Sequence, residues 1–213
     1  MTSLVLPLTN PTRPVEGRTD GALSRAPGTA DFTSLSEPAL IAAAVAGHPG
    51  AFDHIVALHQ RDLYLLCYRY VGTHEDAADL TQETFVRAYR GLARFAGASA
   101  LRTWLYRIAT NVCLTRMAQK RPQTEPLDAR PHADVGAESA PARLEREERE
   151  ARLRAAVATL PAKQRAAVVL RMWHDLSHQE VAEVLGISEG AAKANVFHAI
   201  RSLRRLLATE AIR

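Results

Sequence analysis

The sequence predicts an all-α fold, in which two small helical domains are joined by a flexible linker. Aromatic residues make up only 6% of the 213 residues, and strands depend on aromatic and β-branched side chains. Apolar residues recur at helical spacing on both sides of a proline-rich segment that lacks this periodicity. The predicted limits are 1–33 for a disordered leader, 34–120 for the first domain, 121–142 for the linker and 143–213 for the second domain.

Composition and cysteine usage narrow the class of protein. The formal charge of +4 and the pI near 9.4 favour a polyanionic partner without establishing one. Cys67 and Cys113 lie far apart in the sequence, with neither metal-ligand spacing nor a disulfide pattern, which fits buried thiols in a reducing cytoplasm. The N-terminus lacks the basic region of a signal peptide, and no segment approaches the ~18 apolar residues of a membrane span. We expect a cytoplasmic protein without membrane insertion.

Four helices are predicted in the first domain, which is enough for a compact bundle. The first lies between Ser36, which can cap it, and Gly47, which ends it. The second covers residues 50–71, the third 74–92 and the fourth 101–120. In the third helix the polar side chains lie mainly opposite an apolar stripe. The stripe consists of Leu80, Phe85, Ala88, Tyr89 and Leu92.

The second domain is predicted to begin with a charged helix over 143–160. Its Glu–Arg pairs four residues apart form a solvated face that supports the helix. Pro161 then ends this helix and begins another, over 162–174, because proline suits a first helical turn and disfavours continuation.

A helix-turn-helix follows in the sequence. Ser177 and Glu180 form a capping box, in which each side chain can satisfy an amide at the start of a short helix. Gly186 ends that helix in a position that tolerates positive φ. Ser188 can then cap a last helix over 189–208. Two capped helices around a glycine turn are typical of this motif.

The last helix is a candidate for the major groove of DNA. It offers Glu189, Lys193 and Asn195 to bases or phosphates, and Arg201 extends the basic charge behind them. From Ala151 to the end there are ten Lys or Arg and five Asp or Glu, a net charge of +5. The alternative is a plain helical hairpin with a solvated basic face, but the turn chemistry and the charge both favour DNA.

Three stretches together resemble one known family. Residues 76–89 (DAADLTQETFVRAY) are similar to region 2.2 of sigma-70-type factors, and residues 101–111 (LRTWLYRIATN) to regions 2.3 and 2.4. Residues 160–165 (LPAKQR), with the helix-turn-helix after them, resemble region 4. The order, the spacing and the lack of a region 3 match the extracytoplasmic-function group. The resemblance covers about residues 36–207 and implies a sigma factor, which directs promoter-specific transcription initiation by RNA polymerase.

The resemblance also implies partners. In the family the polar face of the third helix binds the clamp helices of the polymerase β′ subunit, which falls here on Asp79, Gln82 and Glu83. Without the resemblance, a solvated face that binds nothing would be the safer interpretation. The β flap of the polymerase is the other expected contact on the core enzyme. An anti-sigma factor is a partner that the resemblance allows, although no residue identifies one.

The fourth helix would read and melt the minus-10 element, since aromatic and basic groups together hold unstacked bases. Its candidates are Arg102, Trp104, Tyr106, Arg107 and Asn111. The two rings are two residues apart and so lie on different helix faces, and we expect at least one to be buried. Arg107 and Asn111 are therefore the better candidates for DNA contact.

The minus-35 element would be read by the last helix and its cap. The candidates are Ser188, Glu189, Lys193, Asn195, His198 and Arg201. Asn195 and His198 stand where the family often has arginine, and Thr115 stands where aspartate is common. We expect these changes to alter the minus-35 preference and to weaken phosphate binding, because each lost cation lowers the salt dependence.

Two other classes of function are alternatives. A helix-turn-helix regulator that acts independently of core polymerase would need an effector or phosphoacceptor domain, for which the first half shows no pattern. An enzyme would need catalytic groups. His174 and His178 have metal-ligand spacing, but Ser177 begins a new helix between them, and the pair His54 and His59 fits no better. We expect no catalytic residue, no metal and no cofactor.

Overall fold

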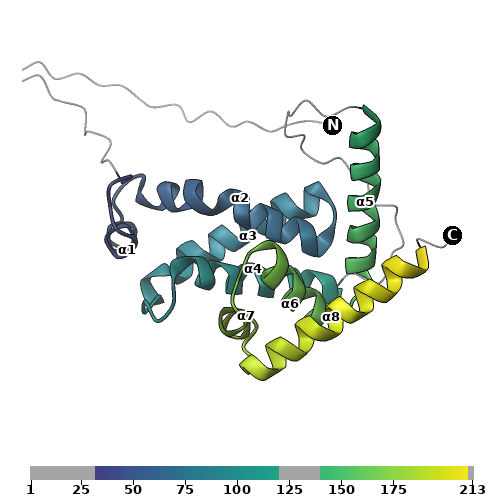
Figure 1. The fold of residues 1–213 in the computed structure, drawn as a ribbon. Helices are drawn as coiled ribbons and strands as arrows, with labels where there is room; N and C mark the ends of the chain where they lie inside the picture. Colours follow the sequence, from purple (N-terminus) through teal and green to yellow (C-terminus); the bar gives the residue numbers. More distant parts are fainter. Residues whose placement is uncertain (1–31, 120–139, 211–213) are drawn as a thin grey trace, which may run out of the picture. The chain divides into compact units, whose positions relative to one another are not determined.

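The computed structural model describes residues 32–119 and 140–210, and these form helices without any strand (Figure 1). The all-α prediction is confirmed. The predicted leader at 1–33, apart from its last two residues, lies outside the described residues, and so does most of the predicted linker at 121–142. The helices are α1 (Glu37–Val45), α2 (Ala51–Val71), α3 (His74–Gly91), the 3-10 turn η1 (Leu92–Arg94), α4 (Leu101–Gln119), α5 (Ala140–Ala158), α6 (Ala162–Trp173), α7 (His178–Leu185) and α8 (Glu189–Glu210).

Most helix boundaries of the first half lie near their predicted positions. Ser36 occupies the N-cap position of α1, but its side chain makes no capping hydrogen bond, so the predicted side-chain cap is not formed. Gly50 and Gly72 flank α2 with φ angles of 83° and 82°, a conformation that residues with a Cβ rarely adopt. Thr73 caps α3, because its hydroxyl oxygen accepts a hydrogen bond from the amide of Asp76 at 3.4 Å. Local sequence chemistry therefore explains where α2 and α3 begin.

The core of the first half lies between α2, α3 and α4, which pack against one another (Figure 1). The largest fully buried side chain of this half is Tyr106 on α4, and the next largest are aliphatic: Ile55, Leu63, Leu66, Leu80, Leu101, Leu105 and Val112. The two cysteines also lie here, each fully buried, and their thiols share a hydrogen bond. The prediction of buried thiols is confirmed, although the sequence did not predict that they meet.

Two contacts position the start of α4. The carboxylate of Glu37 in α1 accepts a hydrogen bond from the amide of Leu101 at 3.0 Å, and so satisfies one of the free amides at the beginning of the helix. Gly91 lies so close to the ring of Trp104 that an added Cβ would stand 3.3 Å from it. α4 is thus fixed against both α1 and the end of α3.

In the second half, the predicted helix-turn-helix is confirmed in α7 and α8. The amide of Ser177 donates to the carboxylate of Glu180 at 2.8 Å, and the amide of Glu180 donates to the Ser177 hydroxyl at 3.2 Å. Gly186 has a φ of 62° and ends α7. The hydroxyl of Ser188 accepts from the amide of Ala191 at 3.2 Å and caps α8. α6 and α5 both pack against α8 (Figure 1).

Helices of the two halves also contact each other. α4 packs on α7, and α2 packs on α6. Buried residues from both halves belong to one hydrophobic cluster, so the described residues share a continuous core. The domain limits at 34–120 and 143–213 remain a prediction. No helix of the described residues has the length and apolarity to cross a membrane.

Leu63→Ala tests the core between α2, α3 and α4. Leu63 is fully buried, so we expect the free energy of unfolding to fall by about 2 to 5 kcal/mol. Leu58→Ala, on the same helix, is the control: Leu58 is 57% exposed, and its loss should change stability by no more than about 0.5 kcal/mol. Urea unfolding measures both. Equal losses would contradict the packing described for α2.

Candidate functional site

The polar face of α3 is accessible, as its predicted role requires. Asp79 and Gln82 are exposed, and the half-buried Glu83 forms an ion pair with Arg87 one turn later. Because all of them are on one well-packed helix, these groups are held in fixed positions relative to one another. A rigid row of carboxylates and an amide can meet basic side chains of a partner protein.

Tyr89 does not lie in the core, where the predicted apolar stripe of α3 placed it. Its side chain is 62% exposed, and its ring meets that of Phe52 edge-on at 5.0 Å. Val86, one turn earlier, is 47% exposed. The stripe is wider than the core that covers it, so α3 presents an apolar surface beside its polar face. This exposed apolar surface was not predicted. The sequence feature that indicates it is the presence of apolar residues on α3 outside the positions that face the core.

On α4, Arg102 and Tyr106 face the loop that follows α6. Tyr106 is almost completely buried, and its hydroxyl lies 3.1 Å from Nδ1 of His174. Arg102 donates from Nε to the Tyr106 hydroxyl at 3.2 Å and from Nη2 to the backbone carbonyl of His174. The expectation that at least one of the two rings is buried is confirmed by Tyr106.

Arg107 and Asn111 lie one turn apart on α4, and both are exposed. Nε of Arg107 donates to the backbone carbonyl of Glu183 in α7 at 3.1 Å. Thr115, a further turn along, donates its hydroxyl proton to the carbonyl of Asn111 at 2.8 Å. The α4 side chains that face the second half are therefore basic or polar. One of them, Arg107, forms a hydrogen bond with α7.

Trp104 packs against the segment that precedes α4. It is half-buried, and its ring lies 5.1 Å from that of Phe95 at the other side of α4, close to Gly91. The structure thus joins Arg102 to Tyr106, places Arg107 against α7 with Asn111 one turn further along, and packs Trp104 against Phe95 near η1.

The outer face of α8 carries the predicted minus-35 residues. Lys193 forms an ion pair with Glu189 at 2.8 Å, and His198 and Arg201 are exposed. The side-chain amide of Asn195 donates to the carbonyl of Ala191 in its own helix at 2.9 Å. The hydroxyl of Ser188 already accepts the hydrogen bond that caps α8. Lys193, His198 and Arg201 are therefore the most accessible of the predicted set.

Phe197 was not predicted as a site residue, yet it is 62% exposed on α8 beside His198. Phe197 directly follows Val196, whose side chain is buried. Adjacent residues of a helix point in different directions, and this indicates that Phe197 points outward. A ring on this face can contact an apolar group in a major groove, such as the methyl of thymine.

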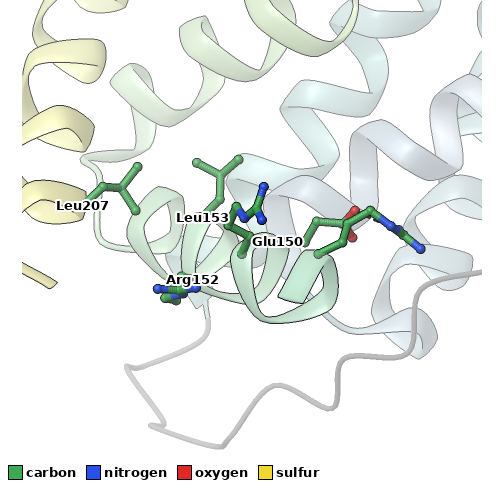
Figure 2. Close-up of a pocket in the computed structure, with 6 residues that line it drawn as sticks. Glu150, Arg152, Leu153 and Leu207 are labelled. Atoms are coloured by element: carbon green, nitrogen blue, oxygen red, sulfur yellow. Dashed lines mark hydrogen bonds and ion pairs between the residues drawn. The ribbon is translucent and has the colours of Figure 1, made fainter. Parts of the chain in front are cut away.

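An open pocket of about 480 Å³ lies between α5 and α8 (Figure 2). Leu153 of α5 and Leu207 of α8 contribute its apolar lining (Figure 2). Its arginines interact along their own helix, as in the pair of Arg149 with Glu145 at 3.5 Å. Among residues 32–119 and 140–210, no group of three or more His, Cys, Asp or Glu side chains could hold a metal ion.

Known proteins resemble the chain over both halves. The family description "Sigma-70 region 2" matches residues 55–123, and "Sigma-70, region 4" matches residues 150–203. The ECF RNA polymerase sigma factor SigM of Mycobacterium tuberculosis is 37% identical over 174 residues, which cover 81% of this chain and 85% of SigM. The chain belongs to the ECF group of sigma-70-type sigma factors.

Further relatives agree with this. The ECF RNA polymerase sigma factor SigW of Bacillus subtilis is 33% identical over 174 residues, covering 76% of this chain and 91% of SigW. The solved structure of CnrH in complex with the cytosolic domain of CnrY is 28% identical, with a TM-score of 0.62 over 81% of this chain and 97% of CnrH. The function is that of an RNA polymerase sigma factor, and the alternative of an independent helix-turn-helix regulator is not favoured.

His174 of this sigma factor is a buried residue whose role the sequence did not indicate. Burial, together with the nearby cations of Arg69 and Arg102, lowers the pKa of its imidazole from 6.5 to about 3. Its Nε2 is buried and has no hydrogen-bond partner among the described residues. The ring is therefore neutral in the folded protein near pH 7, and it packs edge-on against Tyr106 at 5.1 Å.

Acid should weaken the fold through His174. In the unfolded chain the imidazole of His174 takes up a proton below about pH 6.5, whereas in the folded chain it does so only near pH 3. The folded state therefore becomes less stable relative to the unfolded state as the pH falls. Between pH 7.5 and 5.5 this one group should lower the free energy of unfolding by roughly 1.4 kcal/mol. The measurement is urea unfolding of the wild type and of His174→Asn at both pH values. If the variant loses as much stability as the wild type, His174 is not the group responsible.

Proposed function

We propose that α3 docks this sigma factor on core RNA polymerase and that α4, held against it, binds the minus-10 DNA. The observation that carries the proposal is that the two packed helices present different chemistry: carboxylates and an amide on α3, and basic and amide groups on α4. Asp79, Gln82 and Glu83 would contact the clamp helices of β′. Charges on a rigid helix orient a partner without a large loss of side-chain freedom.

On α4, Arg107 and Asn111 are the proposed contacts to the opened strand. Arg107 can pair with a phosphate, and Asn111 can form hydrogen bonds with a base edge. Arg102 supplies further positive charge one turn before Tyr106. Trp104 supports the position of α4 through Phe95 and Gly91, and we give it a packing role. This division of roles follows from exposure, since a contact residue must be reachable by the nucleic acid.

α8 is proposed to lie in the major groove of the minus-35 element. Lys193, His198 and Arg201 are exposed on its outer face and would contact phosphates or base edges. Phe197 adds an apolar contact between them. The side chain of Asn195, which stands where the family often has arginine, forms a hydrogen bond within α8. The minus-35 preference would therefore depend on the other side chains.

The remaining parts of the proposal concern setting and partners. We propose that the protein acts in the cytoplasm, holds no cofactor and has no catalytic site of its own. The β flap of core polymerase is the proposed contact of the second half. CnrH was solved with the cytosolic domain of CnrY, and this supports a protein partner for the present chain as well. We propose an anti-sigma factor, the partner that the family resemblance allows.

Transcription with core polymerase tests the function. Purified chain and core enzyme are incubated with fragmented genomic DNA, and the 5′ ends of the transcripts are sequenced. We expect a discrete set of start sites that core enzyme alone does not produce, because core alone cannot select promoters. A chain that binds duplex DNA but adds no start sites to core enzyme would contradict the assignment.

Asp79→Arg combined with Gln82→Ala tests the docking face of α3. Both side chains are exposed, so the fold should remain intact while binding to core polymerase weakens by at least about 10-fold, a typical effect of reversing a charge at an interface. Asp53→Arg, an exposed charge reversal on α2, is the control and should keep wild-type affinity. Core affinity is measured by fluorescence anisotropy. Unchanged affinity of the double variant would exclude this docking face.

Arg201→Ala tests the position of α8 on DNA. If Arg201 contacts a phosphate, the slope of log K against log salt for promoter binding by the holoenzyme should fall by about one unit. Lys163→Ala is the control, because Lys163 is exposed at the start of α6, outside the proposed interface. The slope of the control should equal that of the wild type. An unchanged slope for Arg201→Ala would remove this residue from the minus-35 contacts.

A further inference from the structure

An apolar patch lies on α3 beside its polar face, and neither the fold nor the proposed DNA contacts account for it. Tyr89 is 62% exposed and Val86 is 47% exposed. The ring of Phe52, from α2, meets the ring of Tyr89 at 5.0 Å, with an angle of 73° between the two planes. Single exposed apolar side chains are common on protein surfaces, whereas a contiguous group of them marks a site of interaction.

The ring of Tyr89 is held in place although it is exposed. Phe52 is half-buried, and it also contacts the buried Phe85, whose ring lies 6.5 Å away at 88°. Edge-to-face contacts of this kind are a favourable geometry for aromatic pairs. Tyr89 is thus supported from the core through Phe52. A partner that packs against Tyr89 therefore immobilises a side chain that has already lost much of its freedom.

The patch is continuous with the proposed docking face of α3. Gln82, Val86 and Tyr89 follow one another at intervals of four and three residues, so they share one side of the helix. A partner that reaches Gln82 therefore also lies over Val86 and Tyr89. Protein interfaces commonly have an aromatic or apolar centre and a polar edge, which is the composition found here. This continuity identifies core polymerase as the occupant of the patch.

The polar and the apolar parts of this surface act on different steps of binding. Asp79 is exposed, and Glu83 already shares its charge with Arg87 in an ion pair that faces solvent. Charges at an exposed edge attract a partner and raise the association rate, but they add little to the lifetime of the complex. A ring that becomes fully buried in the complex mainly slows dissociation.

We propose that Tyr89, supported by Phe52 and flanked by Val86, is a hydrophobic anchor that sets the dissociation rate of this sigma factor from core polymerase, while the polar residues of α3 set the association rate. The inference rests on the proposed docking of α3 and names the side chain that holds the complex together. The complementary surface of the polymerase is then an apolar pocket for the ring, with basic side chains near Asp79 and an acidic side chain near the exposed Arg90.

The rates of binding to core polymerase test the anchor. Full-length chain with a fluorescent label at its N-terminus is mixed with core enzyme in stopped flow, and dissociation is followed after adding an excess of unlabelled chain. Tyr89→Ala should raise the dissociation rate by about tenfold or more and change the association rate by less than about twofold. Asp79→Asn should show the opposite pattern, with slower association and a weaker dependence of that rate on salt.

Two further variants separate the anchor from a general loss of apolar surface. Leu58→Ala is the matched control, because Leu58 is 57% exposed and lies on a different side of α2 from Phe52. It should keep both wild-type rates. Tyr89→Phe keeps the ring and should keep most of the slow dissociation, since the anchor acts through packing. Circular dichroism and urea unfolding check that every variant is folded under the conditions of the binding experiment.

A dissociation rate of folded Tyr89→Ala equal to that of the wild type would overturn the anchor, and so would a loss of affinity that comes only from slower association. If Tyr89→Ala weakens self-association of the free chain and leaves core binding unchanged, the patch serves a second copy and the proposal is wrong. The proposed function fails separately, when Asp79→Arg with Gln82→Ala keeps core affinity or when core polymerase gains no start sites. The two failures are therefore distinguishable.

Discussion

The packing of α4 against α2 and α3 determines where each candidate contact of the first half can lie. The inner side of α4 is filled by Leu105 and Val112, so Arg102, Arg107 and Asn111 face outward or toward the second half. Glu37 fixes the first turn of α4, and Gly91 lets Trp104 approach closely. A shift of α4 along its axis would misplace all of its basic side chains at once.

The same constraint links the two halves of the chain. Since the outward face of α4 is basic, it needs electron-rich partners, and in the free protein these are carbonyl oxygens of α7 and of the loop before it. Tyr106 is buried by this contact together with His174. A surface that binds its own chain through backbone oxygens is chemically suited to exchange them for the oxygens of DNA.

Local signals in the sequence predicted most of the fold. The capping box at Ser177 and the glycine at Gly186 specify the helix-turn-helix through contacts within a few residues. Tyr89 was misplaced because periodicity tells which face of a helix is apolar, but not how much of that face the rest of the chain covers. The partner of Tyr106 lies 68 residues away, and no local pattern predicts such a contact. The residue-level contacts to polymerase and DNA rest on the family resemblance and stay predictions.

The most direct test is an electron cryomicroscopy structure of the chain bound to core polymerase and promoter DNA. We expect α3 to contact the polymerase through Asp79 and Gln82, and the opened minus-10 strand to lie against Arg107 and Asn111. A complex in which the opened strand lies away from Arg107 and Asn111 would contradict the proposed minus-10 surface.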